Sequence, residues 1–178
     1  VKMPVFSFSK LKKVDTVLGP EIKSTGEIIG KDVNLPKALY KGFIASGVNV
    51  PDYGTALMTV SDKDKEEIIP LAKRLISLGY HIVATTGTGK ALEAEGIKVD
   101  VIEKINENSN DILDAIRDGR INLVVNTMTE GKTSETDGFL IRREAVENNI
   151  PCLTSLDTAE ALLQAMETIH FQLEDMSK

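Results

Sequence analysis

The stretch YHIVATTGTGK, Tyr80–Lys90, decides how the rest of the chain is interpreted. Tyr80–Ala84 is a short apolar run typical of a buried strand, and Thr85–Gly89 is a loop of small residues. A helix is then expected over Lys90–Glu95. A strand that leads through such a loop into a helix collects unpaired backbone N–H groups at the positive helix end. The pattern therefore predicts a site for a phosphate or carboxylate group.

Two interpretations of this Thr/Gly loop stay open at the level of the residues alone. Its spacing meets neither the G-x-G-x-x-G pattern of dinucleotide-binding folds nor the Walker pattern of nucleotide hydrolases. The alternative to an anion site is a structural one, in which Thr88 caps the helix and Gly87 makes the turn.

Composition argues against several classes of protein. The chain has 178 residues, of which 42% are hydrophobic and 27% charged, as in ordinary globular proteins. A net charge of −6 argues against a nucleic-acid-binding surface. We find no apolar run of membrane-spanning length and no signal-peptide pattern, so a cytoplasmic location is expected. The single Cys152 allows no internal disulfide, and His81 and His170 are too isolated to predict a zinc site.

Residues 54–178 alternate strands with helices, which is typical of a parallel sheet covered on both faces. The expected strands are Ala56–Val60, Tyr80–Ala84, Val99–Glu103, Ile121–Asn126 and Pro151–Ser155. The expected helices are Ser61 or Asp62 to Leu78, Lys90–Glu95, Asn108 or Ser109 to Gly119, Phe139–Asn148, and one capped by Asp157. Pro70 predicts that the first helix either kinks or becomes regular only near Glu67. The predicted fold class is a three-layer α/β/α domain with a five-stranded parallel sheet.

The first part of the chain has a different character. Residues 1–35 hold short apolar pieces that cannot bury a core, and they predict the tail of a preceding domain. Residues 36–53 predict a short helix, within Leu35–Ser46, and a turn-rich linker over Gly47–Gly54. We expect residues 1–46 to pack on the outside of the sheet domain or to be partly disordered.

Polar side chains follow every expected strand. Because parallel strands end at one edge, these side chains should share a rim, where such sheets bind their ligands. Lysines, hydroxyls and an amide at one rim suit an anionic ligand with sugar-like hydroxyls, such as a nucleoside monophosphate. The alternative is an ordinary polar sheet edge. The rim residues are Ser61, Asp62, Lys63, Lys65, the Thr/Gly loop, Lys104, Asn126, Thr127, Thr129, Thr154, Ser155 and Asp157.

The rim offers carboxylates but predicts no catalytic residue. Acid–base chemistry needs a carboxylate or imidazole that is held beside the ligand. The candidates are Asp62, Asp64, Glu103 and Asp137, and all of them lie in hydrophilic segments without a histidine partner. The rim is therefore interpreted as a binding site.

Two blocks of sequence carry a family resemblance. Thr55–Ala91, TALMTVSDKDKEEIIPLAKRLISLGYHIVATTGTGKA, together with VVNTMTEGK at 124–132, resembles the methylglyoxal-synthase-like fold. It resembles more closely the regulatory domain that ends the large chain of carbamoyl-phosphate synthases. Pro4–Gly30, PVFSFSKLKKVDTVLGPEIKSTGEIIG, is similar to the segment that closes the second ATP-grasp unit of that family. The two blocks follow the family's order and cover nearly the whole chain.

The resemblance implies an allosteric effector-binding domain without a catalytic site or cofactor of its own. The parent ligase makes carbamoyl phosphate from bicarbonate, glutamine-derived ammonia and ATP with Mg or Mn, for pyrimidine or arginine biosynthesis. The implied partners are a nucleotide effector such as UMP, the remainder of the large chain and a glutaminase small subunit. Assembly into a homo-oligomer is compatible with the resemblance.

The resemblance also assigns the site by position. Lys65 and the loop residues Thr85, Thr86, Gly87 and Thr88 match phosphate contacts. The residues that match ribose or base contacts are Lys104, Asn126, Thr127 and Thr129. Met128 and a longer loop up to Gly138 depart from the family pattern.

The alternative function is that of a free-standing methylglyoxal-synthase-type lyase. Those enzymes have a glycine-rich segment with the catalytic carboxylate after the fourth strand, whereas TEGKTSETDG, Thr129–Gly138, lacks that glycine run. Bifunctional purine-synthesis cyclohydrolases have motifs similar to TVSDK and TTGT. Their sequence continues into a V-K-T-L-H-P-K stretch, which is absent here. The sequence therefore favours neither of these related chemistries.

Overall fold

The computed structural model describes residues 1–6, 24–48, 51–103, 105, 111–127 and 137–175. Within these residues a five-stranded parallel sheet has the order β5-β4-β3-β6-β7. Its strands are β3 (Gly54–Thr59), β4 (Tyr80–Thr85), β5 (Asp100–Ile102), β6 (Leu123–Asn126) and β7 (Cys152–Leu153). The predicted three-layer fold with a five-stranded parallel sheet is confirmed.

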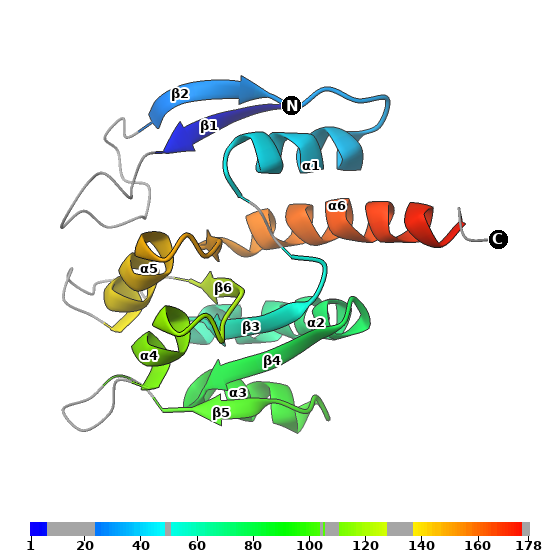
Figure 1. Cartoon of the computed structure of the whole chain (residues 1–178). Helices are drawn as coiled ribbons and strands as arrows, with labels where there is room; N and C mark the ends of the chain where they lie inside the picture. Colours follow the sequence, from blue (N-terminus) through cyan, green and yellow to red (C-terminus); the bar gives the residue numbers. More distant parts are fainter. Residues whose placement is uncertain (7–23, 49–50, 104, 106–110, 128–136, 176–178) are drawn as a thin grey trace.

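Helices cover both faces of this sheet (Figure 1). One face is covered by α2 (Lys65–Ser77), which follows the short turn η2 (Asp62–Asp64), and by α3 (Thr86–Ala94) and α6 (Leu156–Asp175). The other face is covered by α4 (Asp111–Arg117) and α5 (Asp137–Glu147).

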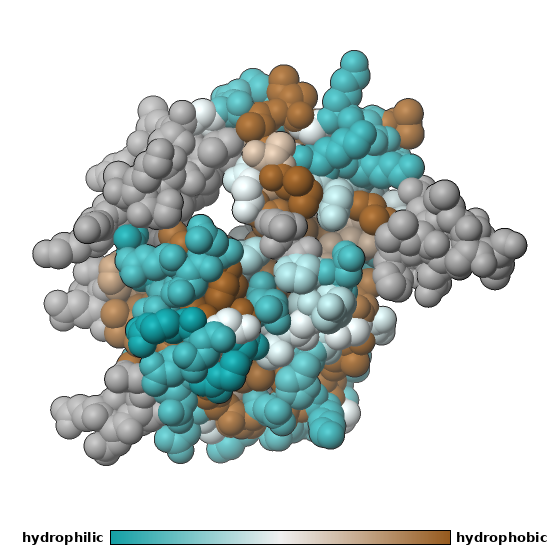
Figure 2. Space-filling view, viewed as in Figure 1, coloured by the Kyte–Doolittle hydropathy of each residue, from teal (hydrophilic) through white to brown (hydrophobic). Residues whose placement is uncertain are grey.

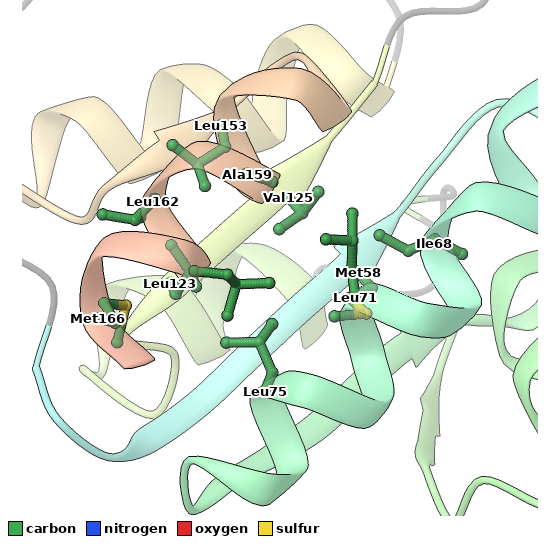
Figure 3. Close-up of a pocket in the computed structure, with 11 residues that line it drawn as sticks. Met58, Ile68, Leu71, Leu75, Leu123, Val125, Leu153, Ala159, Leu162 and Met166 are labelled. Atoms are coloured by element: carbon green, nitrogen blue, oxygen red, sulfur yellow. The ribbon is translucent and has the colours of Figure 1, made fainter. Parts of the chain in front are cut away.

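The central strand β3 shows why the sequences of the inner strands are continuous apolar runs. Its residues Ala56 and Met58 face the core under α2 and α6, while Leu57 faces the core under α4 and α5. All three are fully buried, because both faces of the sheet are covered. A gap of about 10 Å³ beside Met58 and Leu75 is lined by apolar side chains only (Figure 3). It holds no more than about one water molecule, so it is a packing defect rather than a ligand site.

The N-terminal part forms a small separate pairing. Strands β1 (Lys2–Phe6) and β2 (Ser24–Ile29) pair antiparallel and pack on α1 (Leu35–Ala45). Helix α1 lies along α6, and its Phe43 joins the core under α6 (Figure 1). Apolar surface remains near the hairpin and the loop before α1, where Ile29 and Val33 are exposed (Figure 2). The proposed division at residues 35 and 53 stays a prediction.

Four described helix starts differ from the expectation. Helix α2 begins at Lys65 rather than at Ser61 or Asp62, and helix α5 begins at Asp137 rather than at Phe139. Helix α3 begins at Thr86 rather than at Lys90, so the Thr/Gly stretch is the first helical turn and not a loop. Helix α6 begins at Leu156, so Asp157 lies inside the first turn instead of capping it. Helix α2 continues through the exposed Pro70. The expected start of α4, Asn108 or Ser109, lies outside the described residues.

Strands β3 and β4 are one residue longer than predicted, whereas β5, β6 and β7 are shorter, because the buried run extends beyond the paired residues. The sixth strand begins at Leu123 rather than Ile121, and the seventh covers only Cys152 and Leu153. Ile121 is nevertheless buried and packs in the core under α4. An apolar pattern thus reports burial, and hydrogen-bonded pairing covers only part of the buried run.

Candidate functional site

The candidate site lies at the carboxyl ends of β3, β4 and β6. From β3 the chain adds β4 and β5 on one side and later β6 and β7 on the other. The connecting helices change face between these two halves. The boundary between β3 and β6 is therefore a topological switch point, where open α/β sheets bind their ligands.

Buried polar residues are concentrated at this edge. In the part of the chain that the structure describes, the polar or charged side chains that are buried are those of Ser61, Thr85, Thr88, Asn126 and Arg142. All of them lie at or directly beneath the carboxyl ends of these strands. Burying a polar group costs free energy unless it is hydrogen-bonded. The concentration therefore indicates that this edge is organised by specific hydrogen bonds.

Two threonines fix the turn that follows β3. The Val60 N–H donates to Thr88 Oγ1 (3.1 Å), and the Ser61 N–H donates to Thr127 Oγ1 (2.9 Å). The Ser61 hydroxyl donates to Asp64 Oδ2 (2.6 Å). The turn is thereby held between α3 on one side and the residue after β6 on the other, which sets the position of the start of α2.

The structural alternative for the Thr/Gly stretch is wrong in both parts. Thr85, not Thr88, is the N-cap of α3, and Thr88 lies in the first turn with its hydroxyl on Val60. Gly87 is a helical residue without a positive φ, so it makes no turn that requires glycine.

The start of α3 presents donors to the rim. The Thr85 side chain makes no capping hydrogen bond to the first turn, and its hydroxyl donates instead to Thr59 Oγ1 (3.3 Å). The backbone N–H groups of the first turn, including Gly87, have no partner within the helix itself. A Cβ placed on Gly87 would lie only 3.4 Å from Lys65 Nζ. Helix end and ammonium group thus converge on one point.

Lys65 is held in place by a weak partner. Its Nζ lies 2.6 Å from Asp62 Oδ1, and the Asp62 side chain is 94% exposed. Exposed ion pairs of this kind contribute about 0–1 kcal/mol. An arriving phosphate can therefore replace the Asp62 carboxylate, and it gains the N–H groups of α3 as well.

Helix α5 adds a residue that sequence reasoning missed. Arg142 Nη1 donates to Asn126 Oδ1 (2.6 Å), and both side chains are almost fully buried. A Cβ on Gly138 would lie 3.0 Å from Arg142 Nη1, so glycine leaves room for this pair. The available signal was spacing, because Arg142 lies next to Ile141 and three residues before Ala145, both of which face the core.

Seven of the nine predicted site residues are described, and the structure brings them to the same edge. They are Lys65, Thr85, Thr86, Gly87, Thr88, Asn126 and Thr127, whereas Lys104 and Thr129 lie outside the described residues. Most of the 128–138 loop lies outside them too. Over the described ranges, no cluster of His, Cys, Asp and Glu is arranged to hold a metal ion. No described helix is long and apolar enough to cross a membrane.

A larger hollow, of about 240 Å³, lies at the opposite edge of the sheet. Its lining includes Arg117, Asn148 and Ile150, at the C-terminal ends of α4 and α5, and Asn122 directly before β6. Helix C-termini carry partial negative charge and disfavour a phosphate. For an anionic ligand, electrostatics therefore favours the rim over this hollow, although the hollow has more open volume.

Comparison with known proteins agrees with the fold. Residues 67–154 match the family model described as an MGS-like domain. A crystal structure of methylglyoxal synthase from Elizabethkingia anophelis NUHP1 superposes with a TM-score of 0.54 and 19% identity, over 64% of this chain and 79% of that chain. A crystal structure of ForH gives a TM-score of 0.48 and 23% identity, over 65% and 79%. The likeness to the synthase concerns the fold alone. The match to the MGS-like model and the observed parallel-sheet fold agree over residues 67–154.

Proposed function

We propose that this chain is the allosteric effector-binding domain of a carbamoyl-phosphate synthase large chain. Its rim binds a nucleoside monophosphate, with UMP as the first candidate. The observation that carries the proposal is the approach of Lys65 Nζ to Gly87 at the uncapped start of α3. A phosphate group there receives backbone N–H donors, the positive helix end and one ammonium group.

The width of the rim supports a ligand longer than a small sugar phosphate. Thr85 pairs with the β3 side at Thr59, and Asn126 is the register partner of Thr59 on the other side. Neighbouring strands lie about 4.8 Å apart, so the backbones at Thr85 and Asn126 are roughly 10 Å apart. A ligand that contacts both ends must extend well beyond its phosphate, as a nucleotide does.

The assignment to this ligase family rests on the resemblance of Pro4–Gly30 and Thr55–Ala91. Under this proposal, catalysis, ATP and its Mg or Mn belong to the parent enzyme, and this chain carries no catalytic residue. Its partners are the remainder of the large chain and the glutaminase small subunit, in the cytoplasm. Exposed apolar residues near the hairpin, Ile29, Val33 and Leu35, supply surface for such a partner.

The direct test is calorimetric titration of the whole chain with UMP, uridine and inorganic phosphate. We expect UMP to bind more tightly than uridine. Lys65→Ala should weaken UMP about 10- to 100-fold, since a charge-assisted contact contributes about 1.5–3 kcal/mol, and should leave uridine nearly unchanged. Lys104→Ala should weaken both. Lys73→Ala is the matched control, because Lys73 lies on the same helix with only a long 4.0 Å contact to Glu95.

The lyase alternative is tested with dihydroxyacetone phosphate. The fold of a methylglyoxal synthase is shared, so this reaction is the specific competitor. We expect no methylglyoxal formation by the pure chain. Turnover that a substitution of Asp62 or Asp64 abolishes would replace the regulatory proposal by the lyase. Absence of both turnover and nucleotide binding would leave the rim as a polar sheet edge.

A further inference from the structure

The orientation of the Asn126 carboxamide is fixed by its neighbour. A guanidinium has only N–H donors and no acceptor, so the atom that faces Arg142 Nη1 at 2.6 Å must be the carboxamide oxygen. The NH2 group of Asn126 therefore points away from the guanidinium. Because both residues are buried, 2% and 3% exposed, solvent does not average this arrangement.

The NH2 group of Asn126 has no hydrogen-bond acceptor among the residues that the structure describes. Across the described ranges, the hydrogen bond of the Asn126 side chain is the one it accepts from Arg142. Buried N–H donors are nearly always paired, and an unpaired one costs about 1–3 kcal/mol. This one lies at the end of β6, at the switch point and beside the turn that Thr127 holds. An acceptor supplied by a ligand would satisfy it.

We propose that Arg142 is a positioning residue, which holds Asn126 so that its NH2 group donates to an oxygen acceptor of the bound ligand. The inference rests on the proposed function, because it concerns the end of the same ligand that lies away from the phosphate. The ligand class is then a phosphate ester that carries a carbonyl or hydroxyl oxygen at its far end. A ligand with only donors at that end, such as an ammonium group, meets the wrong side of the amide.

The local backbone is adapted to this pair. Helix α5 begins at Asp137, and Gly138 in its first turn faces both members: a Cβ there would lie 3.0 Å from Arg142 Nη1 and 3.4 Å from Asn126 Oδ1. Any side chain at this position must displace the guanidinium or the amide. Gly138→Ala should therefore disturb the orientation of Asn126 without removing a polar group.

The test compares UMP with inorganic phosphate, which cannot reach the far end of the site. Asn126→Asp keeps the contact with Arg142 as an ion pair but replaces the donor by an acceptor. We expect it to weaken UMP about 10- to 100-fold and inorganic phosphate less than about threefold. Arg142→Met should weaken UMP about tenfold, and Arg142→Lys, which keeps a donor, should recover part of this loss. Arg143→Met is the control, because Arg143 pairs with Glu147 on the same helix.

A measurement without ligand separates the two proposals. Hydrogen exchange of the Asn126 side-chain NH2, followed by NMR, should become about tenfold faster in Arg142→Met, and in Arg142→Lys if the former does not fold. Unchanged exchange, or an unchanged ratio of UMP to phosphate affinity in these variants, would overturn the positioning role. Failure of the unaltered chain to bind UMP or phosphate would overturn the proposed function and the ligand contact, while faster exchange would still support the fixed amide.

Discussion

The two edges of the same sheet use similar polar residues in different ways. At the amino edge the donors already have partners within the chain. The Thr55 N–H donates to Asn122 Oδ1 (2.8 Å), and the Tyr80 hydroxyl donates to the Pro51 carbonyl. At the carboxyl edge the first turn of α3 has no capping side chain, and Asn126 keeps an unused NH2 group within the described part of the chain. Closed hydrogen bonds stabilise the fold, whereas open donors favour a ligand. The chemistry of an edge therefore depends on which donors are already used.

The largest loss of stability is expected from a substitution at the amino edge of the sheet. Gly54 has φ +148°, and a Cβ there would lie 2.4 Å from Asn122 Oδ1. Gly54→Ala must strain the backbone and displace the amide that holds β3 to β6, at a cost of about 2–4 kcal/mol. Urea unfolding measures this loss. UMP affinity, measured below the unfolding transition, should stay within about twofold. A large loss of affinity would mean that the two edges are not independent.

A smaller loss of stability is expected at the carboxyl edge, where the Thr88 hydroxyl holds the turn after β3. Thr88→Val keeps the shape of the buried side chain but removes the acceptor for the part-buried Val60 N–H. An unsatisfied N–H costs about 1–3 kcal/mol, so thermal unfolding should occur at lower temperature. Thr86→Val is the matched control, because Thr86 is exposed at the start of the same helix. Equal effects of the two changes would contradict the role of the Thr88 hydroxyl.

The amino edge should also show a signature at alkaline pH. Burial, helped by the negative charge of Asp52, raises the pKa of Tyr80 to about 12. The folded state therefore resists ionisation that the unfolded chain undergoes near pH 10. The stability from this group is fully present below about pH 10 and is lost as the pH rises towards 12, up to about 2 kcal/mol. Unfolding free energies of Tyr80→Phe should decline less across that interval, and parallel declines would refute the assignment.

The smallest effect on folding is expected for Lys65, whose replacement should strongly weaken binding. Within the described residues the ion pair of Lys65 is with the exposed Asp62, so Lys65→Ala should change the free energy of unfolding by less than about 0.5 kcal/mol. Chemical denaturation of the ligand-free chain provides the number. A loss of more than about 1 kcal/mol would place Lys65 among the structural residues and weaken its assignment to the site.

The sequence predicts most of the fold because the central strands β3 and β6 are buried on both faces and therefore appear as apolar runs. The start of α3 could not be predicted, since Thr and Gly have low helix propensity. Tertiary contacts decide it: Thr88 bonds to Val60, and the absent side chain of Gly89 lets α3 approach Val101 closely. Local preference and long-range packing disagree there, and packing determines the helix start.

The location of the candidate site could be predicted from the sequence, but the hydrogen-bond partners of its residues could not. Strand ends in a parallel sheet share an edge, which is why Lys65, Thr88 and Asn126 could be grouped from sequence. Arg142 was missed because two adjacent arginines in a helix resemble a solvated face. Only the phase of α5, set by Ile141 and Ala145, turns Arg142 inward while Arg143 pairs with Glu147.

The packing of α1 on α6 has a consequence for the order of events during synthesis. Helix α1 ends at Ala45 and α6 begins at Leu156, so more than a hundred residues must be translated between the two partners. At about 5–20 residues per second, α1 waits roughly 6–20 s for the surface on which it rests. Until then Phe43, which ends up in the core beneath α6, has no apolar neighbour from that helix. The apolar face of α1 therefore stays open to aggregation until α6 emerges from the ribosome.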